Sequence, residues 1–204
     1  MQERRSNADR SEETRRALIE AGRMLFLEKG YAATGTPEVV ARAGLTRGAL
    51  YHHFKDKQAL FRAVVESEAR QIATEIEAGA LDAASPVSAL AQGSRAYLKA
   101  MKTPGRLRLM LLEGPSVLGP ETMRRIDLAT GGRELRLGIA DALGSDAPAA
   151  RIDALADLIS AMFERAVIAG ASGEDVELYA QTVQDLLTRL LEREPSAETS
   201  PTLP

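Results

Sequence analysis

The segment 46–49 places a hydroxyl, a guanidinium and two small side chains within about one helical turn. Thr46 is a preferred helix cap, and the free N–H groups behind such a cap can bind a phosphate. Arg47 can donate two hydrogen bonds to guanine O6 and N7, or contact a phosphate. Gly48 and Ala49 let a helix approach a groove closely, and the Ala49 methyl can contact a thymine methyl. This pattern indicates a surface that reads double-stranded DNA.

Further polar residues extend this candidate surface. Tyr51 and His52 follow about one turn later, and Lys57 begins the next predicted helix, so all three can reach backbone phosphates. Tyr51 is also compatible with partial burial against the first helix. Thr36, at the start of the preceding predicted helix, is the last candidate. Because His52 and His53 point about 100° apart on a helix, we predict no metal site there.

Two short helices joined by a glycine-containing turn must position these groups. The predicted helix 37–43 has proline at its first position and stops at Gly44, and the predicted helix 47–53 follows the Thr46 cap. Inward-facing apolar residues anchor the unit, namely Val39, Val40, Ala43, Leu45, Leu50 and Phe54. This is the pattern of a helix-turn-helix, whose second helix presents its N-terminal residues to base edges in the major groove.

Composition excludes several kinds of site. The 204 residues include no cysteine and two adjacent histidines, which excludes disulfides, thiolate metal sites, cysteine nucleophiles and a histidine triad within one chain. Hydrophobic residues make up 45% and charged residues 27%, as in globular proteins. No apolar run is long enough to span a membrane, and the charged N-terminus lacks the apolar stretch of a signal peptide. We therefore expect a cytoplasmic protein with no membrane partner.

Charge is distributed unevenly along the chain. Residues 1–62 contain 12 Lys and Arg against 8 Asp and Glu, a net charge of +4, whereas the remaining 142 residues carry −7. A basic first third is consistent with a polyanionic partner. A chance fluctuation could also produce a difference of this size, so the motif above remains the main argument.

Helical periodicity punctuated by glycine and proline predicts an all-α protein. Gly131 and Gly132 mark a weak point in the seventh of nine predicted helices. The nine ranges are 12–29, 37–43, 47–53, 57–78, 86–101, 106–113, 121–143, 148–170 and 175–194.

Four parts follow from this pattern. We expect a flexible basic arm at 1–10, a DNA-binding domain at 11–62 whose fourth helix continues to about residue 78, a larger domain at 63–194, and a disordered tail at 195–204. The arginines of the arm, Arg4, Arg5 and Arg10, either follow phosphates or belong to a solvated terminus.

The first 62 residues resemble the TetR family of transcriptional regulators. Two departures are mild: Val40 stands where isoleucine is usual, and the family's pair of threonines before the second helix is replaced by the segment 34–37. The residues that carry the resemblance are Leu25, Phe26, Gly30, Tyr31, Ala41, Ala43, Gly44, Leu45, Gly48, Ala49, Leu50, Tyr51, His52, His53, Phe54, Lys57 and Leu60.

The resemblance implies a nine-helix TetR-like fold with an N-terminal three-helix helix-turn-helix module and a C-terminal ligand-binding and dimerisation domain. It implies a homodimeric repressor that a small-molecule effector releases from a palindromic operator. A ligand-dependent activator and a DNA-binding regulator without an effector remain alternatives. It implies no catalytic residue and no cofactor.

Two sets of residues in the larger domain are candidates for these implied functions. Glu113 either recognises a polar ligand group or is a surface acid beside a turn, and the methionines also suit a core. The candidate ligand contacts are Tyr97, Met101, Met110, Glu113, Met123, Met162 and Phe163. The apolar stripes of the last two helices either face a partner subunit or pack on their own chain. The candidate dimerisation residues are Leu155, Leu158, Ile159, Met162, Ala166, Val183, Leu186, Leu187 and Leu190.

An all-helical enzyme and a scaffold without DNA recognition are the competing classes. The larger domain has no histidine, no cysteine and no glycine-rich nucleotide motif, so the sequence argues against an enzyme. The intact set Arg47, Tyr51, His52 and Lys57 argues against a loss of DNA recognition.

Overall fold

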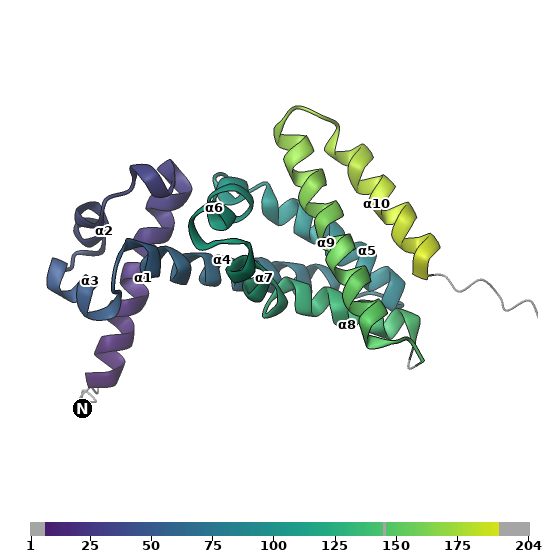
Figure 1. The fold of residues 1–204 in the computed structure, drawn as a ribbon, viewed down its shortest axis with the longest axis horizontal. Coiled ribbons are helices and arrows are strands. Elements are labelled where there is room, and N and C mark those ends of the chain that lie inside the picture. The colour runs from purple at the N-terminus through teal and green to yellow at the C-terminus, as the bar shows by residue number, and fades with distance from the viewer. Residues whose placement is uncertain (1–6, 145, 192–204) are drawn as a thin grey trace, which may run out of the picture.

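The computed structural model describes residues 7–144 and 146–191, and these residues form helices and turns without any strand (Figure 1). No helix within these ranges is long and apolar enough to cross a membrane. The elements are α1 (Asn7–Ala33), α2 (Thr36–Ala43), α3 (Arg47–His53), α4 (Lys57–Ala80), α5 (Pro86–Met101), the π-helix η1 (Arg108–Glu113), α6 (Gly114–Leu118), α7 (Pro120–Leu128), α8 (Gly131–Leu143), α9 (Ala149–Ala171) and α10 (Val176–Leu191).

Helices α1, α2 and α3 form a separate lobe at one end of the molecule, and α4 leads from this lobe into the larger one (Figure 1). The predicted anchors Val39, Leu50 and Phe54 are buried, and they join Phe26 and Phe61 of α1 and α4 in one core. The predicted helix-turn-helix is therefore confirmed, with its apolar residues turned inward and its polar residues left outside.

The first helix begins earlier than predicted. It starts at Asn7 rather than at residue 12, and the Thr14 hydroxyl donates to the Arg10 carbonyl oxygen at 2.8 Å. Arg10 is therefore helical rather than part of a free arm. Arg4 and Arg5 lie outside the described residues, as does the tail 195–204.

Gly30 ends the regular part of α1, as its position predicted. Its φ of 85° and ψ of 172° break the helix and turn the last residues of α1 in a new direction. A side chain at this position would be strained by the positive φ, and its Cβ would also collide with the Glu113 carboxylate. The Thr34 hydroxyl then donates to the Gly30 carbonyl oxygen at 2.7 Å, which satisfies an acceptor that the kink leaves free.

The larger lobe differs from the prediction in its middle. The predicted helix 121–143 consists of two helices, α7 and α8, because Thr130 leaves the helical conformation with φ of −135° and ψ of −116°. The Asp127 carboxylate accepts the backbone N–H of Gly132 in the first turn of α8. The short helix α6 precedes them, and Gly119 with φ of 83° separates α6 from α7. The described residues thus contain ten α-helices and a π-helix where nine helices were predicted.

A buried ion network ties the two lobes together. Glu68 of α4 accepts hydrogen bonds from Arg23 of α1 and from Arg106, whose Nε lies 2.6 Å from the Glu68 carboxylate. Arg106 also donates to both carboxylate oxygens of Glu75 at 3.0 Å and to the Ala100 carbonyl oxygen at 2.7 Å. Glu68 and Arg106 are almost inaccessible to solvent. We call Arg23, Glu68, Glu75 and Arg106 the ion network.

Candidate functional site

The N-terminus of α3 is capped, anchored to the core and exposed to solvent, which are the features expected of a helix that contacts DNA. The Thr46 side chain accepts a hydrogen bond from the Ala49 N–H at 3.2 Å, so Thr46 is the predicted cap. Leu50 is completely buried and fixes the helix to the core, whereas Thr46, Arg47 and Gly48 are exposed. The first turn of α3 therefore presents its side chains to solvent on a rigid support.

Three of the predicted contact residues lie together between α2 and α3. The Arg47 guanidinium lies 5.5 Å from the centre of the Tyr51 ring, and Tyr51 also hydrogen-bonds to Thr36. Those hydrogen bonds, first from Thr36 and then from Arg47, lower the pKa of the Tyr51 phenol. Tyr51 is exposed and is not buried against α1, which was the alternative prediction.

Thr36 is the first residue of α2 and not its cap. Gly35 occupies the cap position, and its N–H donates to the Glu38 carboxylate at 3.0 Å. Glu38 thereby satisfies the start of the helix, which leaves the Thr36 hydroxyl free to hydrogen-bond with Tyr51.

The two adjacent histidines take different positions. His52 is exposed and half-covered His53 lies between it and the buried Phe54, with the two imidazole centres 5.1 Å apart. Within the described ranges no three His, Asp or Glu side chains cluster as metal ligands. His52 thus remains available at the surface of α3.

Lys57 is engaged within the protein, although we predicted it to contact phosphate. Its ammonium donates to the carbonyl oxygens of Tyr31 at 2.9 Å and of Thr34 at 3.1 Å, and it lies 4.1 Å from the centre of the Tyr31 ring. These contacts fix the end of α1 to the start of α4. Lys55, two residues earlier, is exposed and has no hydrogen bond or ion pair with any described residue. Lys55 was not among the predicted contacts, although a lysine in the turn after a recognition helix is a signal for one.

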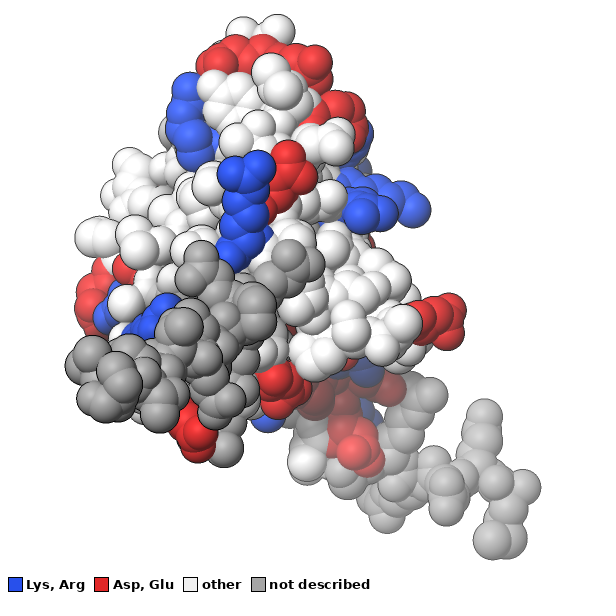
Figure 2. Space-filling model, turned by 90° about the vertical axis from the view of Figure 1, so that its right-hand side faces the viewer, with Lys and Arg blue, Asp and Glu red and all other residues white. Residues whose placement is uncertain are grey.

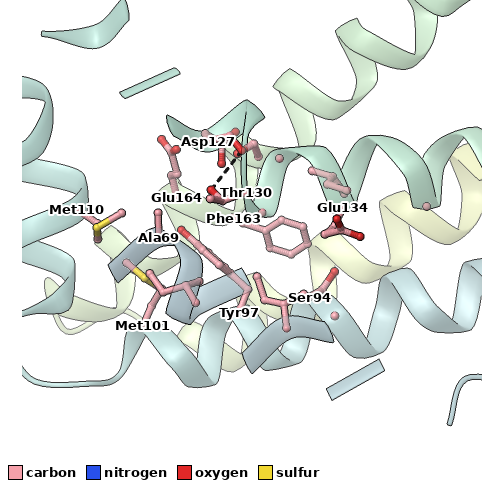
Figure 3. A pocket seen from close by; sticks show the side chains of 18 of the residues that line it. Ala69, Ser94, Tyr97, Met101, Met110, Asp127, Thr130, Glu134, Phe163 and Glu164 are labelled. Atoms are coloured by element: carbon pink, nitrogen blue, oxygen red, sulfur yellow. Dashed lines mark hydrogen bonds between the residues drawn. The ribbon is translucent and has the colours of Figure 1, made fainter. Parts of the chain in front are cut away.

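The larger lobe contains a cavity of about 940 Å³, partly open to solvent. Residues from α4, α5, η1, α7, α8 and α9 line it, and five of the seven predicted ligand contacts are among them: Tyr97, Met101, Met110, Met123 and Phe163. In Figure 3 the Tyr97 side chain extends from α5 toward the side that carries Thr130, Asp127 and Glu164, while Met101 and Met110 lie at one end. The ring centres of Tyr97 and Phe163 are 6.1 Å apart.

Glu113 does not line the cavity but joins the two lobes. Its carboxylate accepts the Tyr31 N–H at 2.9 Å, just beyond the kink at Gly30. Arg108, at the other end of η1, donates to the Leu27 carbonyl oxygen at 2.9 Å. This contact between the lobes is neither of the two roles predicted for Glu113. The local sequence pattern could not predict it, because Tyr31 and Glu113 are far apart in the sequence. Met162, the other predicted contact outside the cavity, packs in the core of α5, α8, α9 and α10.

The π-helix η1 therefore contacts both the cavity and the lobe of α1, α2 and α3, which we call the DNA-side lobe. Its residues Met110 and Leu111 line the cavity, and Arg108 and Glu113 hold the end of α1. A wide π turn places these four side chains on two different faces of six residues, and such turns recur at functional positions. We call the contacts of Arg108 and Glu113 with α1 the η1 clasp.

The cavity also contains carboxylates that the sequence analysis missed. Asp127 is half-buried and Glu164 lies at the edge, and burial raises the pKa of both carboxyl groups. Burial also raises the pKa of the Tyr97 phenol, and the charges of Glu164 and Asp127 raise it further. Asp127 and Glu164 lie on different helices, so no local pattern connected them.

The predicted dimerisation residues divide into two sets. Ile159, Ala166, Val183 and Leu187 are buried within the chain, so they belong to its own core rather than to an exposed face. Leu158, Leu186 and Leu190 are exposed, Leu158 by 63%, and Leu155 and Met162 are half-buried. Helices α9 and α10 pack side by side, which covers the inner half of each apolar stripe (Figure 1).

Several leucines of these stripes remain exposed to solvent. Figure 2 views the molecule from the side on which α9 and α10 lie in Figure 1, and charged groups are scattered between white surfaces there. Leu178 of α10 is exposed by 63% as well. Four large exposed leucines on two neighbouring helices form an apolar surface of the kind that marks interaction sites.

Comparisons with known proteins agree with this architecture. Bacterial regulatory proteins of the tetR family match residues 18–64, and the tetracyclin repressor-like C-terminal domain matches residues 87–193, which is more than half of the chain. A TetR-family transcriptional regulator from Pectobacterium atrosepticum is 33% identical, with 94% of this chain and 100% of that chain covered and a TM-score of 0.70. RolR, solved with resorcinol, shares the fold at a TM-score of 0.70 and 18% identity, with 92% of each chain covered.

Curated relatives match over part of their length. The transcriptional regulator AcrR of Shigella flexneri is 34% identical over 108 residues, which are 52% of this chain and 50% of AcrR. The transcriptional repressor BepR of Brucella suis is 35% identical over 109 residues, which are 52% of this chain and 51% of BepR. The match thus spans about half the length of these relatives. The family consists of transcriptional regulators, which are not enzymes. The helix-turn-helix, the all-helical larger lobe and these matches together place the chain in the TetR family of transcriptional regulators.

Proposed function

We propose that the chain is a cytoplasmic, homodimeric repressor that binds a palindromic operator and is released from it by a small molecule. The observation that carries this proposal is the exposed start of α3, where Arg47 has no ion pair with any described carboxylate. The guanidinium is oriented by Tyr51 and free to reach a guanine edge. In this division residues 11–62 read DNA, and residues 63–191 bind the effector and the second subunit.

Dimerisation uses the apolar surface of α9 and α10. Leu158, Leu186 and Leu190 remain uncovered in the single chain, and a second copy that presents the same surface would bury all of them by two-fold symmetry. A symmetric dimer also presents two α3 helices to DNA, as a palindromic site requires, with centres about 34 Å apart. Sedimentation equilibrium tests this step: Leu158→Asp combined with Leu186→Asp should give a monomer.

Release follows if the effector prefers a conformation in which the two α3 helices no longer match that spacing. A ligand shifts such an equilibrium only by its difference in affinity for the two conformations. The cavity of about 940 Å³ is large enough for a drug-sized molecule. RolR, which has the same fold, was solved with resorcinol, so this fold accommodates a small organic ligand.

Selection of random DNA duplexes by the purified protein tests the proposal. We expect a two-fold symmetric consensus, and Arg47→Ala should weaken binding to it by about 1–3 kcal/mol and relax base preference at one position of each half-site. The variant should remain dimeric. Binding without any consensus, or unchanged binding by Arg47→Ala, would contradict the role assigned to α3.

A further inference from the structure

We propose that the cavity binds an organic cation with an apolar, ring-containing body. This inference rests on the proposed function, because it names the chemical class of the effector. It is carried by the charges that line the cavity, by their lack of partners, and by the aromatic and apolar groups beside them.

The lining is strongly acidic. Among the described residues that line the cavity are six carboxylates and a single cation, Arg124, and they include neither lysine nor histidine. The six are Glu77, Asp127, Glu134, Asp141, Asp157 and Glu164. An anionic ligand would meet repulsion from nearly every charged group of this wall, whereas a cation would be attracted.

The protein leaves the central part of this charge uncompensated. Arg124 lies 3.6 Å from Asp157 and Glu134 lies 3.4 Å from Arg133, so those two carboxylates have cationic neighbours. Asp127 receives only a backbone N–H, from Gly132, and Glu164 has no hydrogen bond or ion pair with any described residue. Asp127 is half-buried, and a half-buried carboxylate without a cation is uncommon unless a ligand supplies the charge, whereas Glu164 lies at the exposed edge of the cavity.

The neighbouring groups suit the rest of such a ligand. The Tyr97 hydroxyl, deep in the cavity, has no hydrogen bond with any described residue and can accept one from an N–H. The rings of Tyr97 and Phe163, set at 59° to each other, offer faces that attract a cation. Figure 3 shows Tyr97 and Phe163 below Asp127 and Glu164, with apolar groups such as Met101 at the far end.

The acidic part and the apolar part of the cavity lining would therefore both be satisfied by a ligand that has a cationic head and an apolar body. The acidic side, formed by Asp127 and Glu164 above Tyr97, takes the ammonium or amidinium head. The wall of methionine and aliphatic side chains, with Met101, Met110 and Ile72 among them, takes the apolar body. A neutral apolar ligand would fill the cavity but leave the carboxylates unpaired.

Three probes with one ring system and different charges test the proposal by isothermal titration calorimetry. They are 2-naphthaleneacetamidinium, 2-naphthaleneacetamide and 2-naphthaleneacetate, which have heads of the same shape, and the cation also carries N–H donors for Tyr97. We expect the cation to bind at least about tenfold more tightly than the amide, and the anion to bind most weakly. Equal binding of all three, tighter binding of the anion, or no binding of the cation would overturn the proposal.

A matched pair of variants locates the effect. Glu164→Gln should weaken binding of the cation about tenfold while the affinity for the amide stays within about twofold. Glu121→Gln removes the same charge from an exposed residue of α7 that does not line the cavity, and it should change neither affinity. Equal losses in the two variants would mean a general electrostatic effect and would overturn the assignment to the cavity.

Operator binding separates this inference from the function on which it rests. If the selected duplex binds but the cation does not, the repressor proposal stands and the cationic effector is wrong. If the cation binds and no duplex is selected, the cavity assignment stands and the repressor proposal is wrong. If both bind, adding the cation should weaken duplex binding by the wild type more than by Glu164→Gln.

Discussion

The ion network and the acidic side of the cavity are two groups of carboxylates, and each group has one more deeply covered member, Glu68 in the network and Asp127 in the cavity. In the ion network, Glu68 and Glu75 both receive hydrogen bonds from Arg106, and Glu68 receives a further one from Arg23. On the acidic side of the cavity, Asp127 and Glu164 have no cationic partner among the described residues. Arginines of the same chain therefore neutralise the carboxylates of the ion network, whereas Asp127 and Glu164 remain without a counter-charge.

The difference separates charges that hold the fold from charges that await a partner. A buried pair with all its hydrogen bonds made is costly to break, because removing one member leaves the other buried and uncompensated. An unpaired carboxylate beside a cavity carries its desolvation cost in the free protein and loses that cost when a cation binds. The same criterion applies to the DNA side, where Lys57 is engaged by two carbonyl oxygens and Lys55 is not.

Breaking the ion network should have the largest effect on stability. We expect Arg106→Met to lower the free energy of unfolding by about 3–5 kcal/mol, because Glu68 would stay buried without its main partner. Urea denaturation followed by circular dichroism measures this loss. Arg165→Gln breaks the exposed pair with Glu174 and should cost less than about 1 kcal/mol. Similar losses in the two variants would remove the distinction between this network and surface ion pairs.

Replacing Lys57 should lower stability and replacing Lys55 should not, and the loss should be smaller than that in Arg106→Met. Lys57→Met removes a charged donor from the Tyr31 and Thr34 carbonyl oxygens, so we expect a loss of stability of about 2–3 kcal/mol in urea denaturation. Lys55→Met should leave stability unchanged within about 0.5 kcal/mol. It should instead reduce the slope of log affinity for DNA against log salt by about 1, because one phosphate contact is lost. An unchanged salt slope in Lys55→Met would show that an unpaired lysine is not by itself a phosphate contact.

The η1 clasp gives an intermediate case, since Glu113 is partly exposed, accepts one backbone N–H and has a single, long ion pair with Arg108 at 4.0 Å. We expect Glu113→Ala to lower stability by about 1.5 kcal/mol and to speed amide exchange at Tyr31. Hydrogen exchange followed by mass spectrometry measures the second effect in peptides that cover the end of α1. Glu121→Ala is the matched control on exposed α7. Slow exchange at Tyr31 in Glu113→Ala would mean that the kink at Gly30 holds without the clasp.

Much of the DNA-side lobe could be predicted from the sequence because its structure is set by local signals. The Thr46 and Asp56 caps accept hydrogen bonds from backbone N–H groups three residues later, at 3.2 Å and 2.7 Å. The anchors Val39 and Leu50 follow helical spacing. Here the local pattern and the tertiary structure agree, so the bounds of α2 and α3 match the predicted ranges to within one residue.

The larger lobe was harder because its function depends on contacts between distant segments. An apolar stripe predicts that a helix is covered but not by what, which is why Ile159 and Val183 were assigned to a partner surface when they pack within the chain. The acidic side of the cavity joins α7 and α9, and the clasp joins η1 to α1. Sequence spacing carries no information on such contacts, so five cavity residues could be named from their type while Asp127 and Glu164 were missed.

The smallest effect should come from the unpaired acid, and its sign should be opposite to that of the first three. The pKa of Glu164 lies above its ordinary value because of burial, with the charges of Asp127 and Asp157 adding to the shift. The folded chain therefore binds a proton at this carboxyl more tightly than the unfolded chain does. At a pH below the ordinary pKa both states are protonated, and Glu164 carries no penalty. As the pH rises through the folded pKa, the folded chain must ionise Glu164 close to the charges of Asp127 and Asp157, so stability falls slightly.

Glu164→Gln removes this penalty, so the ligand-free variant should be slightly more stable than the wild type at neutral pH and equal to it at acid pH. Thermal denaturation at a series of pH values measures the difference, and Glu121→Gln should show no such trend, because Glu121 lies outside the cavity. With the naphthyl cation present, the order at neutral pH should reverse, because the wild type gains more from binding. A wild type that is more stable than Glu164→Gln without any ligand would mean that Glu164 supports the fold, and the contrast between the two groups of carboxylates would fail.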